Sequence, residues 1–529
     1  MHSRLSLPFA LLALAGCGGS QPSGPLSPDT RLKQQREAAT SITAATVFQR
    51  ISVITHDSMA GRNTPSPGLE KTAAYLAAMY ERWGLKPAGD NGTWFQRYAL
   101  VRSRFDPSGS LMEVNEAGTV TRYRLDRWAQ VSGPRTGQTI TGAMRVLSGA
   151  ITAADVTKLD LAGRIVMFVQ NPERAADNRA VLTAIRGKAP SAIIVLQSGD
   201  PAQFTAGVQR ATAGAQVLGG VPVTGVPTLT IHDSIFAGDP NVTNRPDWNA
   251  LRASPTAVVM DVPDQVTVTL RLAETEISRV TAPNVVAMIE GSDPMLRNEY
   301  VVYSAHMDHV GTVGDGVGGC GAQRDTLRGT IDSICNGADD DASGTIGIAM
   351  IAEAFARLKV KPMRSIIILN VSGEEKGLLG SQYFAENPTV AREQIVADLN
   401  FDMIGRNNPD SIVVIGKEHS DLGSTLAMVS GQHPELRLIA ADDIWPNERF
   451  YFRSDHYNFA RKGIPILFFF NGVHPQYHRP SDEVSLIDTS KLARIATLGF
   501  YLGNRIANTP VRPKWNPDSY TEIVQGAGR

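Results

Sequence analysis

Histidines and carboxylates gather in five short stretches of the C-terminal half of the chain. In chain order these stretches supply His306 and Asp308 in SAHMDH, Asp340 in NGADDDASG, Glu374 and Glu375 in SGEEKG, Asp402 in NFDMIG, and His478 in YHRPSD. Imidazole nitrogens and carboxylate oxygens are ligands that Zn²⁺ takes, and a free carboxylate can accept a proton from a metal-activated water. The set predicts a metal-dependent hydrolase.

Apolar runs precede most of these stretches. EYVVYSAH, RSIIILNV and IVADLNFD are typical of strands buried on both faces of a parallel sheet. Helical spacing over 344–358 and 490–501 alternates with such runs between 284 and about 507. The alternation predicts an α/β fold, with a mixed, mainly parallel sheet sandwiched by helices. In such sheets, functional residues collect at the carboxyl ends of the strands.

Each stretch also has a structural explanation. Three adjacent carboxylates raise one another's pKa values when no cation is present, but Asp341 or Ser343 could instead cap the helix that follows. Adjacent glutamates are often a solvated turn. Both explanations can hold together, with one aspartate capping the helix and another binding metal. The coincidence of five such stretches favours a metal site.

The middle of the chain has a different pattern. Short apolar runs such as IVMFV and AIIVL are separated by Pro and Gly, which predicts a small β-rich insert over 126–272. The flanking ranges 41–125 and 273–508 would form the main domain. Residues 509–529 are expected to be a polar, loosely held C-terminal tail.

The N-terminus is typical of an export signal. A basic residue precedes a short apolar stretch, so residues 1–17 are interpreted as a signal peptide. The stretch ends in LAGC, which resembles a bacterial lipobox in which Cys17 would be the lipidated residue. A flexible tether is expected over 18–40. The protein is therefore expected to be exported and anchored by lipid at the bacterial cell envelope, on the periplasmic or outer-membrane side.

The balance of charged residues bears on which binding partners the protein can have. The 51 basic residues nearly balance the 52 acidic ones without a long run of either sign, which argues against a nucleic-acid partner. If Cys17 carries lipid, Cys320 and Cys335 remain as a pair in an oxidising compartment, and a disulfide between them is expected.

Taken together, the motifs resemble those of the M28 peptidase family of co-catalytic zinc aminopeptidases. HxD, GADDDASG, EE, a strand-end Asp in DM and a final His before P-x-D occur in order. SDHYNFARKGIP and the early segment from AGR to GLKP are also similar to the family. The insert resembles a protease-associated domain.

The resemblance implies a role for each residue. One zinc would be held by His306, Asp340 and Asp402, and the other by Asp340, Glu375 and His478. Glu374 would be the general base, and Asp308 would orient His306. The expected cofactors are two Zn²⁺ ions, with Co²⁺ or Mn²⁺ as substitutes. The expected reaction is hydrolysis of the first bond of peptides with a free N-terminus, by a hydroxide that bridges the metals. Tyr451 and His456 are candidates for oxyanion or substrate contacts, with core packing as the alternative.

Other functions remain open at this level. A carboxypeptidase or dipeptidase on the same frame would need a cation such as Arg406 or Arg453 for the substrate carboxylate. A non-catalytic receptor or binding lipoprotein would typically have lost ligands or the base, and none is missing here. A serine hydrolase is disfavoured because no G-x-S-x-G occurs. The sequence predicts neither the oligomeric state nor the preferred N-terminal residue.

Overall fold

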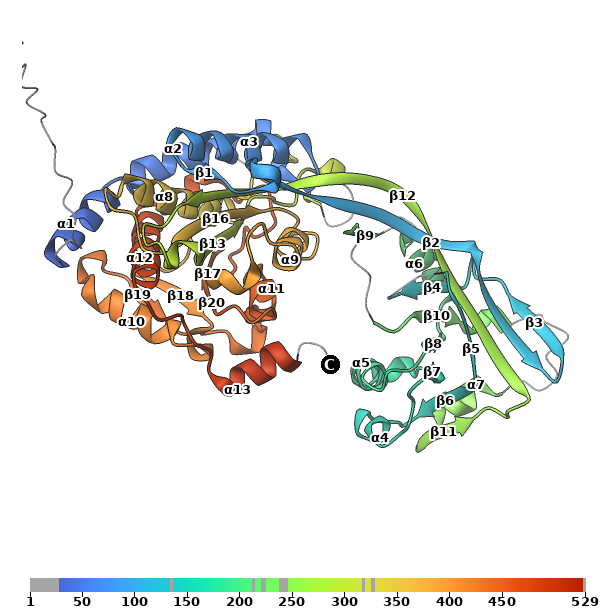
Figure 1. Cartoon of the computed structure of the whole chain (residues 1–529). Helices are drawn as coiled ribbons and strands as arrows, with labels where there is room; N and C mark the ends of the chain where they lie inside the picture. The colour runs from blue at the N-terminus through green and yellow to red at the C-terminus, as the bar shows by residue number, and fades with distance from the viewer. Residues whose placement is uncertain are drawn as a thin grey trace, which may run out of the picture.

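Two long antiparallel strands join a large lobe to a smaller one (Figure 1). They are β2 (Phe95–Glu116) and β12 (Val266–Ile289), and each runs from one lobe into the other. The computed structural model describes residues 28–133, 137–211, 215–219, 225–236, 246–315, 319–324 and 329–526. Cys17, the predicted signal peptide and the first part of the predicted tether lie outside these residues. None of the helices within these ranges combines the length and the apolar character needed to cross a membrane.

The large lobe is built on a sheet whose central strands are parallel. From one edge inward the order is β19 (Ile439–Ala441), β18 (Ser411–Ile415), β20 (Ile466–Phe470), β17 (Ile395–Phe401), β13 (Tyr300–His306), β16 (Ser365–Val371) and β12. β20, β17, β13 and β16 are parallel, whereas β18 and β12 run antiparallel to their inner neighbours. The predicted mixed, mainly parallel α/β sheet is confirmed.

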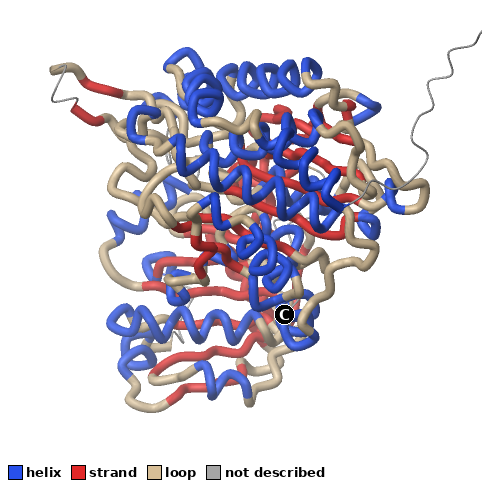
Figure 2. The backbone as a smooth tube through the Cα atoms, turned by 90° about the vertical axis from the view of Figure 1, so that its left-hand side faces the viewer, coloured by secondary structure: helices blue, strands red, loops and turns tan. Residues whose placement is uncertain are grey.

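Helices cover both faces of this sheet, and Figure 2 shows one layer of them lying over the strands. One face carries α1 (Pro28–Ala39), α2 (Ala44–Ile54), α3 (Pro67–Arg82), α8 (Ala342–Arg357), α10 (Leu422–Gln432) and α12 (Thr489–Ala507). The other carries α9 (Leu379–Glu386) and α11 (His456–Ala460). α8 is apolar almost all round and buried along nearly its whole length, as expected of a helix enclosed by others.

The small lobe has its own sheet of six strands. Their order is β11 (Ala257–Asp261), β6 (Met144–Gly149), β7 (Ile165–Val169), β8 (Ala192–Gln197), β10 (Thr228–His232) and β4 (Ala129–Ser132). Four helices accompany them: α4 (Ala153–Thr157), α5 (Ala175–Arg186), α6 (Pro201–Ala211) and α7 (Trp248–Ala253). The sequence pattern predicted the strands but not these helices, which bury few residues; α5, for example, buries Val181 and Ile185. The central strands β6, β7, β8 and β10 are parallel, which requires such connections.

Short strands complete the larger sheet. They are β1 (Lys86–Pro87), β3 (Thr119–Tyr123), β5 (Thr139–Gly142) and β9 (Ala215–Leu218), which pair with β2 or β12. A separate small hairpin is formed by β14 (Gln323–Arg324) and β15 (Ile331–Asp332). The expected disulfide between Cys320 and Cys335 is confirmed, and it encloses this hairpin.

Both ends of the described chain are more ordered than the sequence suggested. The described part of the predicted tether is the helix α1, and Ala38 and Ala39 at its end are buried. The C-terminal segment includes α13 (Pro517–Tyr520) and packs on the large lobe: the Trp515 indole donates to the Gly463 carbonyl at 2.9 Å, and Ile523 is buried. The expectation of a loosely held tail is therefore wrong, because these contacts join residues distant in sequence.

Candidate metal centre

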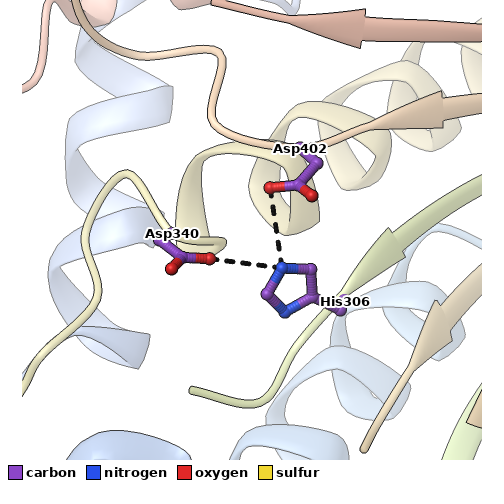
Figure 3. A group of neighbouring side chains, drawn as sticks. All are labelled: His306, Asp340 and Asp402. Carbon is purple, nitrogen blue, oxygen red and sulfur yellow. Dashed lines mark ion pairs between the residues drawn. The ribbon is translucent and has the colours of Figure 1, made fainter. Parts of the chain in front are cut away.

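Three buried side chains meet where two neighbouring strands and a helix converge (Figure 3). His306 is the last residue of β13, Asp402 directly follows β17, and Asp340 lies two residues before α8. The His306 Nε2 atom is 3.3 Å from Asp340 Oδ1 and 3.5 Å from Asp402 Oδ1. One donor atom from each residue lies within 4.8 Å of the other two, so the three can hold a metal ion.

A second set of donors surrounds the other oxygen of Asp340. Its Oδ2 atom is 3.1 Å from His478 Nε2 and 3.6 Å from His309 Nδ1. Glu375 completes the set, with Oε2 at 3.1 Å from His478 Nε2 and Oε1 at 2.9 Å from His309 Nδ1. Asp340 is therefore shared by two adjacent groups of donors, as a bridging carboxylate would be. His309 was not among the residues predicted from the sequence.

The donor atoms are arranged for binding cations rather than for hydrogen bonding to one another. Among the described residues, Asp340 Oδ2, Asp402 Oδ1, Glu375 Oε1, His309 Nδ1 and His478 Nε2 are buried without a hydrogen-bond partner. Leaving such groups unpaired costs about 1–3 kcal/mol each. Donor atoms of a tetrahedral zinc site with bonds of about 2.0–2.1 Å lie about 3.3–3.4 Å apart, close to the separations here. The residues present therefore suit a pair of divalent metal ions.

Asp341, next to the shared carboxylate, fixes the backbone around the first donor set. Its carboxylate caps α8 by accepting from the Gly344 amide at 2.8 Å. It also accepts from the amides of Met403 at 3.1 Å and His306 at 3.1 Å. One buried carboxylate thus ties together the ends of β13, β17 and the start of α8, and burial raises its pKa well above the usual value. Of the two predicted cap residues, Asp341 is the one that caps.

Arg62 holds the loops behind the site, a role that its sequence context did not reveal. Its guanidinium is fully buried and donates to the carbonyls of Met307, Ile54, Asn336 and Gly337 at 2.6–3.0 Å. Met307 follows His306 directly, and Gly337 lies three residues before Asp340. Arg62 therefore fixes the two loops that carry these donors and adds a positive charge near the buried carboxylates.

Asp308 supports Glu374 more directly than it supports His306. Its carboxylate accepts from Thr64 Oγ1 and the Gly373 amide, both at 2.8 Å, and from the Glu374 amide at 3.3 Å. The His306 Nδ1 atom is 3.7 Å from that carboxylate but 3.2 Å from the Asp308 carbonyl. The orienting contact expected from the carboxylate thus comes from the backbone, because the Gly373–Glu374 turn occupies the carboxylate oxygens.

Glu374 lines a pocket beside the first donor set. Burial is the largest cause that raises its pKa well above the usual value, and the charge of Glu375 adds to the rise. The pocket has an empty volume of about 380 Å³, including its open mouth. The residues that line it include the polar His306, Asp340, Glu374 and Asp402, together with Met403, Phe450, Arg453, Ser454, Phe468, Phe470, Val473 and Tyr477.

Neither predicted oxyanion contact lines this pocket. The His456 Nε2 atom donates to the Tyr451 carbonyl at 2.8 Å, its ring stacks on Phe468, and burial lowers its pKa to about 3. The Tyr451 ring packs edge-on against His419 within the core. For both residues the structure supports the packing alternative. Tyr477 lines the pocket instead and stacks on His478 with ring centroids 3.8 Å apart.

Asp482 links the loop of His478 to that of Asp340. It lies four residues after His478, and its Oδ2 atom accepts from the amides of Asp339 at 3.0 Å and Asp340 at 3.2 Å. Burial is the main cause that raises its pKa to about 6. The sequence motif P-x-D contains this residue, but its spacing alone did not reveal the contact.

Residues 284–502, which include every donor described above, match the family model described as Peptidase family M28. A probable zinc metalloprotease of Pyrenophora teres f. teres is 35% identical over 277 residues, which cover 44% of this chain and 53% of that protein. A probable leucine aminopeptidase of Trichophyton verrucosum is 25% identical over 242 residues, covering 43% and 56%. The chain thus spans about half the length of these curated relatives.

Among solved structures, an aminopeptidase from Aneurinibacillus sp. strain AM-1 aligns over 91% of this chain and 98% of that one, with 17% identity and a TM-score of 0.47. The family match over 284–502 includes the strand-end histidine and aspartate, the GADDDASG loop, the glutamate pair and the final histidine. Residues 284–502 of this chain are therefore similar to peptidase family M28.

Proposed function

We propose that this protein is an exported aminopeptidase that uses two zinc ions to hydrolyse the N-terminal bond of peptides. The observation that carries the proposal is the pair of donor sets on opposite oxygens of Asp340, beside a pocket lined by Glu374. His306 and Asp402 would hold one ion with Asp340, and Glu375 and His478 would hold the other. When bound, such ions polarise a carbonyl and lower the pKa of water, so that water can act as a nucleophile near neutral pH.

The protein side chains would then divide the remaining work. Glu374, which lines the pocket beside His306, Asp340 and Asp402, would take the proton of the attacking water and return it to the leaving amine. The acidic residues that line the pocket would favour a free α-amine, and the Phe450, Phe468 and Phe470 rings would favour an apolar first side chain. Tyr477 also lines the pocket, and its phenol would donate a hydrogen bond to the carbonyl oxygen.

Similarity supports this substrate class. Several relatives carry the name probable leucine aminopeptidase, and another is called a probable zinc metalloprotease. Export and lipid attachment at Cys17 are part of the proposal, and they rest on the LAGC pattern and on the disulfide, which suits an oxidising compartment.

The test is a panel of aminoacyl chromogenic amides and their N-acetylated counterparts, assayed with the protein from Gly18 onward. Each would be measured as prepared, after chelation, and with zinc restored. Zinc-dependent cleavage of the free-amine set only, fastest for apolar residues such as leucine, is the expected result. Equal cleavage of the acetylated set would contradict the aminopeptidase assignment.

A carboxypeptidase or dipeptidase is the second candidate because Arg453 lines the same pocket as Glu374. A guanidinium there could pair with a substrate carboxylate. Its side chain is 49% exposed, and it lies over the Phe450 ring and 3.6 Å from Glu448. N-acyl dipeptides with a free carboxylate separate the two candidates, since cleavage of these compounds but not of aminoacyl amides would favour the carboxypeptidase.

A further inference from the structure

We infer that His309 is a ligand of the second metal ion, which gives that site four protein donors and the first site three. The inference rests on the proposed function, in which two metal ions are bound, but it concerns a residue that is not among the ligands proposed there. His309 lies three residues after His306, beyond the end of β13, and its side chain is completely buried.

The position of the imidazole points to ligation. His309 Nδ1, Asp340 and Glu375 form a group whose donor atoms all lie within 4.8 Å of one another. The two distances from Nδ1, 2.9 Å to Glu375 Oε1 and 3.6 Å to Asp340 Oδ2, bracket the edge of about 3.3–3.4 Å expected for a tetrahedral zinc site. The His309 and His478 rings stand edge to face at 5.6 Å, and both lie beside the carboxylates of Asp340 and Glu375.

Ordinary core packing does not account for this side chain. Neither of its ring nitrogens has a hydrogen-bond partner of acceptable geometry among the described residues, although both are buried. The nearest oxygen, Glu375 Oε1, also lacks such a partner. Close donor atoms that are not aligned for hydrogen bonding to each other are expected when both face a common cation.

The backbone of the neighbouring loop makes room for this ring. Gly337 adopts a φ of +55°, and a Cβ atom added there would lie 2.5 Å from the Cγ and Cδ2 atoms of His309. The same loop carries Asp340 three residues later. A glycine at this position thus allows the imidazole of His309 and the bridging carboxylate to approach each other.

Unequal donor sets imply unequal affinity. With two imidazoles and two carboxylates, the second site would fill before the first when metal is limiting. The first equivalent of metal added to the apoprotein would then be bound by His309 and His478, and the second by His306.

Proton NMR of the cobalt-substituted protein tests this order and the ligation together. Imidazole N–H protons of ligating histidines are shifted strongly by Co²⁺, and they disappear in D₂O. With one equivalent of Co²⁺, the wild-type protein should show a shifted N–H signal that His309→Ala lacks. Identical spectra for the two proteins would overturn the inference.

Affinity measured by competition with a chromogenic chelator provides the second readout. His309→Ala should lower the metal affinity of the tighter site by roughly 100-fold. Loss of a residue that only supports a metal ligand typically lowers affinity by about 10–100-fold, and loss of a ligand should cost at least as much. His433→Ala is the matched control, because it removes another buried imidazole, which stacks on Tyr501 away from the donors. Circular dichroism of the apoproteins would establish that both variants fold.

The outcomes separate this inference from the proposed function. Equal affinities for wild type and His309→Ala would overturn the role of His309 and leave the peptidase proposal intact. A wild-type protein that binds no metal would overturn both.

Discussion

The two donor sets around Asp340 differ in how the fold builds them. The first set is attached to the sheet: His306 ends β13 and Asp402 follows β17, and these parallel strands are direct neighbours. The second set comes from loops, and one member, His478, has a side chain that is 36% exposed. Strand ends are positioned by a ladder of backbone hydrogen bonds, whereas loops need separate supports.

Those supports are visible in the structure. Arg62 binds the carbonyls behind His309 and Asp340, and Asp482 binds the amides of the Asp340 loop. The comparison shows that loops can supply the remaining donors of a metal centre when buried side chains hydrogen-bond to the backbone of those loops and hold it in place. It also indicates where each centre can be damaged without the other.

Asp340→Asn should have the largest effect because it damages both centres. The amide has nearly the same size but lacks the charge that the two proposed cations would share. We expect metal content to fall from two ions per chain towards none, and activity to fall by more than the roughly 10²–10⁴-fold typical of losing a general base alone. Metal analysis after gel filtration, together with rates on an aminoacyl amide, checks this. Retention of two ions would show that Asp340 is not shared.

Glu374→Gln should leave both centres intact and remove the proposed base. Metal content is expected to stay at two ions per chain, while kcat falls by about 10²–10⁴-fold. Comparison with Asp340→Asn separates proton transfer from metal binding. Near-normal turnover in this variant would exclude Glu374 as the base.

His306→Ala and His478→Ala should separate the two centres. His306→Ala leaves two carboxylates at the first site, so one ion per chain should be lost. His478→Ala should weaken the second site by roughly 10–100-fold, because His309 would remain. Stoichiometry measured at several free zinc concentrations distinguishes the two. Equal losses would remove the proposed asymmetry between the sites.

The smallest effect concerns stability and pH. Burial is the main cause that raises the pKa of Asp455 to about 7 and that of Asp482 to about 6. The folded apoprotein therefore holds protons that the unfolded chain, with carboxyl pKa values near 3.9, releases. The contribution of these two groups to stability should be fully present below about pH 4 and be lost as pH rises through about 6 and about 7.

Metal binding should reverse this trend, since ligands bind cations in their unprotonated form. The difference in Tm between the zinc-loaded and chelated proteins should therefore widen by several degrees from pH 5.5 to pH 8. Differential scanning calorimetry of both forms measures it. A difference that does not change with pH would show that buried carboxylates near the centre do not control apoprotein stability.

Sequence patterns predicted the first centre better than the second. The apolar runs before His306 and Asp402 correctly located β13 and β17, and the cluster of aspartates correctly placed a capping residue at α8. His309 was missed because a histidine one position after HxD has no periodicity that separates a ligand from a packed residue. Arg62 was missed because its partners lie as many as 275 residues away.

Local patterns determined the residue types available for chemistry, the strands that end at them, and the disulfide that the redox compartment favours. These features depend on neighbouring residues and on alternation along the chain, which a sequence displays directly. The tertiary structure decided which oxygen of Asp340 faces which donors, that Asp308 binds the Gly373–Glu374 backbone, and that Tyr477 rather than Tyr451 reaches the pocket. Each of these depends on loops that meet only after the sheet has formed, so no local pattern contains them.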